Sequence, residues 1–107
     1  MTTKETGLVF SPRERIDYSK NSVVSQQITK SKTGNITLFA FDQGQQLSEH
    51  SAPFDAVLQV LDGTALIHIA EEPHEVHEGE MIILPANIPH AVYATTAFKM
   101  ILTMIRG

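Results

Sequence analysis

The sequence predicts an all-β barrel or sandwich. Short strand-like runs recur along the chain, turn residues such as Gly, Pro, Asn and Asp separate them, and no stretch shows a sustained helical period. In chain order, the expected strands are 23–30, 36–41, 47–49, 57–61, 65–70, 74–77, 81–84, 90–94 and 98–105. Many short strands at this spacing are typical of a closed or two-layered β-structure.

A polar N-terminal arm precedes these strands. Residues 1–22 carry many charges and little apolar periodicity, so we expect an extended arm with one short strand at residues 8–10. Residues 23–107 then form the barrel domain. We expect the arm to lie across the body of the chain or across a second subunit.

The second and last expected strands, 36–41 and 98–105, are apolar on both faces. A strand with only one face on the core alternates more cleanly between apolar and polar residues, so burial on both faces is indicated. The simplest interpretation is a homodimer in which outer apolar faces meet. Packing of the N-terminal arm against the same faces is the alternative.

A turn at Asp62-Gly63 separates two of the apolar runs. An Asp-Gly pair in this position favours a two-residue hairpin between strands 57–61 and 65–70. Counting outward from the turn places Leu58, Val60 and Ile67 on the inner face and His68 on the outer face.

Two histidines are the leading candidates for a functional site. On a regular strand an inward His50 takes Gln46 and Ser48 inward with it, and we expect His90 on the same inner face. Met100 on the last strand is a further candidate for the lining, although it also suits ordinary core packing. An apolar cavity with these few polar groups suits a small organic ligand.

Two segments around these histidines follow known spacings. The first segment places Gly44, His50, Ala52, Ala56 and Gly63 at motif positions, and the second places Gly79, Pro85, Asn87, His90 and Ala94. Together they resemble the two signature motifs of the cupin superfamily, and the resemblance covers about residues 35–105. It implies a double-stranded β-helix, which is a jelly-roll-like barrel. Asn87 stands where the family usually has Gly, and Asn tolerates the left-handed conformation that Gly often supplies.

The resemblance also implies a divalent metal, which family members commonly hold on three histidines and one glutamate. Of those four ligands this chain retains His50 and His90, while alanines occupy the other motif positions. Zn, Fe, Mn, Ni and Cu all accept imidazole, but two protein ligands leave most of the coordination shell to water or substrate. Any metal is therefore expected to bind weakly.

Two functions stay open from the residues. The leading hypothesis is a barrel that binds a small molecule near His50 and His90, with a weakly held metal as an option. The alternative is a metal-dependent dioxygenase or isomerase whose substrate completes the metal shell. No catalytic residue can be assigned from the sequence, and it does not decide whether the protein is an enzyme.

Composition excludes several other classes. The formal charge of −4 and the scattered basic residues argue against nucleic-acid binding, which needs clustered Lys and Arg. No apolar run approaches membrane-spanning length, the first residues are too polar for a signal peptide, and the chain has no cysteine. We therefore expect a cytoplasmic protein.

Overall fold

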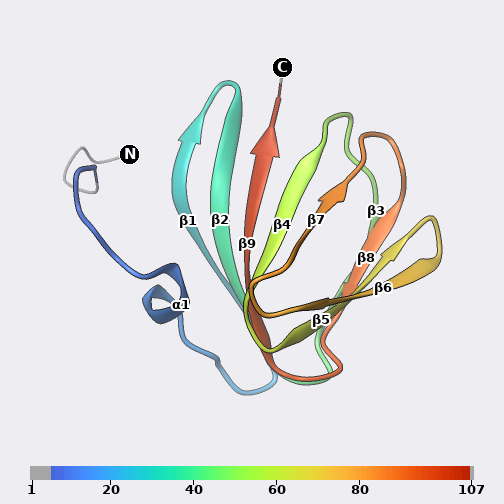
Figure 1. Cartoon of the computed structure of the whole chain (residues 1–107), viewed down its shortest axis with the longest axis horizontal. Helices are drawn as coiled ribbons and strands as arrows, with labels where there is room; N and C mark the ends of the chain where they lie inside the picture. The colour runs from blue at the N-terminus through green and yellow to red at the C-terminus, as the bar shows by residue number, and fades with distance from the viewer. Residues whose placement is uncertain (1–5, 107) are drawn as a thin grey trace.

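The computed structural model describes residues 6–106 of the chain, so the first five residues of the predicted arm and Gly107 lie outside the described residues. Two antiparallel sheets form the body (Figure 1). The larger sheet contains, in order across it, β1 (Val23–Ser31), β2 (Gly34–Phe41), β9 (Phe98–Ile105), β4 (Ala56–Asp62) and β7 (Met81–Leu84). The smaller sheet contains β3 (Gln46–His50), β8 (His90–Tyr93), β5 (Thr64–Ile69) and β6 (Glu72–His77).

All the strands predicted for the body are present, with ends within two residues of the expected positions. The predicted strand at residues 8–10 is not formed. The arm instead contains a single-turn helix, α1 (Pro12–Arg15), which begins with a proline directly after Ser11. Proline is favoured at the first helical position because its missing N–H would have no partner there. Among residues 6–106, no helix has the length and apolar character needed to cross a membrane.

The predicted hairpin at Asp62-Gly63 is wrong. β4 pairs with β7 and β9, whereas β5 pairs with β6 and β8, so the two strands lie in different sheets. Gly63 has a φ of +77°, and a Cβ there would clash with the carbonyl oxygen of Ala97. The turn therefore carries the chain from one sheet to the other. The predicted faces are nevertheless confirmed, since Leu58, Val60 and Ile67 are all buried.

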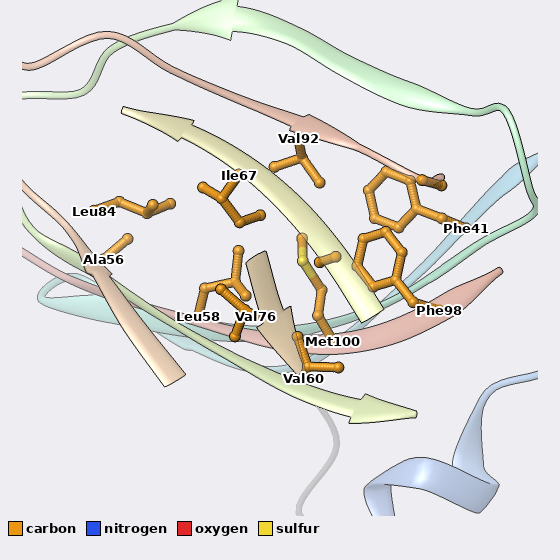
Figure 2. Close-up of a cluster of buried hydrophobic side chains, with 12 residues drawn as sticks. Phe41, Ala56, Leu58, Val60, Ile67, Val76, Leu84, Val92, Phe98 and Met100 are labelled. Atoms are coloured by element: carbon orange, nitrogen blue, oxygen red, sulfur yellow. The ribbon is translucent and has the colours of Figure 1, made fainter. Parts of the chain in front are cut away.

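The space between the sheets is filled by the chain's own side chains. The rings of Phe41 and Phe98 stack with centroids 4.6 Å apart, and aliphatic residues from both sheets pack beside them (Figure 2). Met100, a candidate for a cavity lining, lies within this core and is 1% exposed. Around Met100 the structure therefore has a packed core where the sequence led us to expect an apolar cavity. We call the region of Phe41, Phe98 and Gly63 the aromatic end.

The arm is held to the aromatic end by polar contacts. The Tyr18 hydroxyl donates to Asp62 Oδ2 at 2.5 Å, and Arg13 Nη2 donates to Asp62 Oδ1 at 2.9 Å. Lys99 Nζ donates to the carbonyl oxygen of Arg13 at 2.7 Å. The hydrogen bond from Tyr18 holds the pKa of Asp62 below its ordinary value, while burial and the same carboxylate raise the pKa of Tyr18.

Candidate functional site

His50 and His90 come together at the end of the molecule opposite the phenylalanine pair. His50 is the last residue of β3 and His90 is the first residue of β8, and the two are opposite each other across these strands. Their ring centroids are 4.4 Å apart, and the ring planes make an angle of 68°. We call this region the histidine end; residues 51–55 and 85–89 connect the two sheets there, at the top of Figure 1.

A β-bulge decides which residues of β3 face inward. Leu47 is opposite Val92 and His50 is opposite His90, so three steps along β3 match two along β8. The extra residue brings Leu47 and His50 to the same face, and Leu47 packs against the core.

The bulge also reverses an expectation for the two polar neighbours of His50. Gln46 and Ser48 are exposed, and Gln46 is opposite Tyr93, whose ring contacts His68 on the outer face. The inward orientation predicted for Gln46 and Ser48 is therefore not found, because the simple alternation that predicted it does not continue through a bulge.

Each imidazole is oriented by a backbone carbonyl two residues earlier. His50 Nδ1 lies 3.0 Å from the oxygen of Ser48, and His90 Nδ1 lies 3.3 Å from the oxygen of Ile88. A carbonyl oxygen can only accept, so each Nδ1 carries the proton. In a neutral imidazole this leaves the lone pair on Nε2. A carbonyl partner at the second nitrogen is also the arrangement that prepares a histidine to bind a metal.

The two histidines differ in their exposure. His90 is 7% exposed, whereas His50 is an exposed residue at the mouth of the site. Burial lowers the pKa of His90, and the neighbouring His50 shifts it in the same direction. His90 is therefore held neutral at pH 7, as an acceptor with its lone pair on Nε2.

The connections that carry the histidines are tied to each other. The Asn87 N–H donates to the carbonyl oxygen of Ala52 at 2.6 Å, and Asp55 Oδ1 accepts the Ala86 N–H at 2.8 Å. Asn87 has a φ of +66°, the left-handed conformation that asparagine tolerates in place of glycine. Asp55 thus acts as a loop-stabilising side chain, and the two loops next to His50 and His90 are joined by hydrogen bonds.

The donor set does not fit a resident metal ion. Alanines at positions 52 and 56 offer no ligand atoms, and in the described part of the chain no group of three or more His, Cys, Asp or Glu side chains is placed to hold a metal. Structural zinc sites use four protein ligands and catalytic ones usually three. The two imidazoles fall short of either number.

Comparison with known proteins agrees with this architecture. The family model described as Cupin domain matches residues 37–106. No curated protein matches the chain.

Three solved structures illustrate its range of likeness. A conserved protein of unknown function from Streptococcus pyogenes is 35% identical, with a TM-score of 0.89 over 94% of this chain and 89% of that one. A cupin 2 conserved barrel domain protein from Leptotrichia buccalis is 38% identical, with a TM-score of 0.85 over 87% of this chain but only 45% of that one. Salicylate 1,2-dioxygenase from Pseudaminobacter salicylatoxidans is 16% identical, with a TM-score of 0.72 over 79% of this chain and 26% of that one, which is likeness of fold alone.

Proposed function

The chain belongs to the cupin superfamily, and from its histidine pair we propose that it binds a small molecule at the histidine end. The observation that carries the proposal is the fixed orientation of both imidazoles. Each Nδ1 faces a carbonyl oxygen, which leaves Nε2 of each of the two adjacent rings as the atom that would contact the ligand. Small-molecule sites typically combine apolar side chains with a few polar groups of fixed orientation.

The chemistry of these atoms narrows the ligand class. A neutral imidazole with its proton on Nδ1 accepts a hydrogen bond at Nε2. The ligand should therefore present hydrogen-bond donors, such as hydroxyl or amine groups, to His50 and His90. Because the core beneath the histidines is filled, the ligand must be small and must bind near the surface.

A divalent transition metal has a secondary place in this proposal. Two imidazoles hold Zn, Fe, Mn, Ni or Cu only weakly, so a metal would enter together with a ligand that supplies further donor atoms. The enzymatic alternative, a dioxygenase or isomerase, is supported by the fold alone, and one fold serves many functions.

The test is ligand binding by the protein and by two histidine variants. A thermal-shift screen of small hydroxylated and amine-bearing metabolites should give hits, and Zn²⁺ and Ni²⁺ should be titrated in parallel by calorimetry. His50→Asn and His90→Asn keep a side-chain N–H near the position of Nδ1 but remove Nε2, and each should weaken binding at least about tenfold.

Gln46→Ala is the matched control, because Gln46 lies on the same strand as His50 but is exposed and opposite Tyr93. It should leave binding unchanged. Hits whose affinity is the same in both histidine variants would place the site elsewhere, and a broad screen without hits would contradict the proposal.

A further inference from the structure

Three basic side chains gather at the β1 edge of the larger sheet, around the turn that joins β1 to β2. Lys30 lies near the end of β1, Lys32 lies in the turn itself, and Arg106 directly follows β9. Figure 1 shows the end of β9 and this turn at the same end of the sheet. The Arg106 N–H donates to the carbonyl oxygen of Thr33 at 2.6 Å, so the residue after β9 stays bound to the turn.

A β-bulge in β1 brings two polar side chains to one face of the sheet. Gln27 and Lys30 are three positions apart in the chain, whereas the residues opposite them on β2 are only two apart. Lys30 is opposite Asn35, and Asn35 is opposite Met104, which packs against the core. This face is therefore the inner one. Arg106 follows Met104 by two positions, and alternation places it on the same face.

An open groove of about 510 Å³ lies along this part of β1, and we call it the basic groove. The polar and basic residues of its lining include Gln27, Lys30, Ser31, Lys32 and Arg106. Among the residues that the structure describes, no Asp or Glu lines the groove, although the whole chain has a net charge of −4. The histidine pair is not part of the lining either. A volume of this size is ordinary for a small-molecule site.

The Arg106 side chain is held on one side by an aromatic ring. It is half-buried, and its guanidinium carbon lies 5.2 Å from the centroid of the Phe54 ring. Within residues 6–106, the charged groups of Arg106, Lys30 and Lys32 have neither an ion pair nor a hydrogen-bond partner. A guanidinium presents five N–H donors in a rigid fork that matches the oxygens of an anion. The groove thus holds an oriented cation and two further positive charges without a counter-charge from the described chain.

We propose that the basic groove binds a small molecule through a phosphate group. Arg106 donates two parallel N–H bonds to phosphate oxygens, and Lys30 and Lys32 balance the remaining negative charge. A phosphate ester carries about 1.5 to 2 negative charges at pH 7, so it makes fuller use of three cations than a single carboxylate does. This binding does not depend on the histidine pair, because the groove has no lining residue in common with it.

The test is calorimetric titration of the full chain with inorganic phosphate at low ionic strength. We expect a dissociation constant of about 1 mM or tighter. It should rise with added NaCl, because the lysines are exposed and salt screens their charges. In NMR spectra of the same titration, the backbone amide signals of residues 30–33 and of Arg106 should shift.

Variants of the groove identify the groups that bind. Arg106→Gln and Lys30→Gln should each weaken phosphate binding about tenfold or more, since each removes a charged partner. Arg106→Lys keeps the charge but loses the fork, so its affinity should lie between those of Arg106→Gln and the unaltered protein. Lys20→Gln is the matched control, because Lys20 is also an exposed lysine but lies outside the groove, and it should bind phosphate unchanged.

Four results would overturn parts of this assignment. Absence of saturable phosphate binding, or amide shifts confined to the surroundings of His50 and His90, would remove the site from the groove. Equal affinity for succinate would remove the preference for phosphate. Full affinity in Arg106→Lys would remove the role of the fork. Binding to phosphatidylcholine vesicles that contain phosphatidic acid, without binding of free phosphate, would identify a lipid headgroup instead of a small molecule.

Discussion

Two pairs of rings lie at opposite ends of this molecule, and their surroundings give them different roles. Phe41 and Phe98 are in contact with centroids 4.6 Å apart, and His50 and His90 with centroids 4.4 Å apart. The phenylalanines are completely buried, whereas His50 is exposed and both histidines contact a backbone carbonyl through Nδ1. Because it is enclosed on all sides, the phenylalanine pair contributes to stability, whereas the histidine pair reaches the surface and is the one that we propose for binding.

The largest expected effect lies at the aromatic end. Phe98→Ala removes one ring of the stacked pair from a fully buried position, and we expect it to lower the free energy of unfolding by about 3–5 kcal/mol. Urea unfolding measures this, with Phe98→Leu as a control that should lose less. His50→Ala, measured in the same way, should stay within about 0.5 kcal/mol of the unaltered protein because the residue is exposed. If Phe98→Ala and His50→Ala lowered the free energy of unfolding equally, the two ring pairs would not differ in their contribution to stability.

A smaller effect is expected at the turn beside Phe98. Gly63→Ala must hold a side chain at a φ of +77° and push against Ala97 and Phe98, so we expect a loss of about 1–3 kcal/mol. Gly44→Ala is the matched control, because Gly44 has a φ of +88° but nothing lies within 4 Å of the added Cβ. It should lose less than Gly63→Ala in the same unfolding measurement. If both variants lowered the free energy of unfolding by the same amount, the contacts of Gly63 with Ala97 and Phe98 would add nothing to the cost of the backbone conformation.

The smallest effect is a dependence of stability on pH that comes from the histidine end. Burial lowers the pKa of His90 in the folded chain below the ordinary value of about 6.5. The unfolded chain therefore binds the proton more readily. Above a pH of about 6.5 neither state of His90 is protonated, and the free energy of unfolding is at its full value. It decreases as the pH falls from there through the lowered pKa of His90 in the folded chain.

Urea unfolding across this pH range measures the effect. His90→Asn does not titrate but can still donate to the Ile88 carbonyl, so it should reduce the pH dependence. Phe98→Leu should have a lower free energy of unfolding but the same slope of this energy against pH as the unaltered protein. A slope unchanged in His90→Asn would mean that another group causes it.

The sequence predicted the strands well because apolar alternation and turn residues are local signals. The burial of Leu58, Val60 and Ile67 followed from alternation along single strands. Asn87 lies in the left-handed region, which asparagine tolerates as a property of the residue type. The pairing of His50 and His90 at one site agrees with the resemblance of the two motifs to those of cupins.

The predictions were wrong where a local sequence pattern was used to infer how strands that are distant in the chain pair with each other. Asp62-Gly63 does form a turn, but closing two sheets around one core required β4 and β5 to separate, and no local preference reports that. The orientation of Gln46 and Ser48 failed because a single extra residue in β3 shifts the alternation, and only the pairing with β8 reveals the bulge.

The sequence predicted the strands of the body and their apolar faces, although not the absence of a strand at residues 8–10, and it retains two of the four metal ligands that the cupin resemblance implies. The filled interior and the carbonyl partners of both Nδ1 atoms are properties of the folded chain that no local pattern indicated. The tendency to form a strand depends mainly on residues that are close together in the chain. Packing, hydrogen-bond direction and exposure depend on residues brought together from far apart.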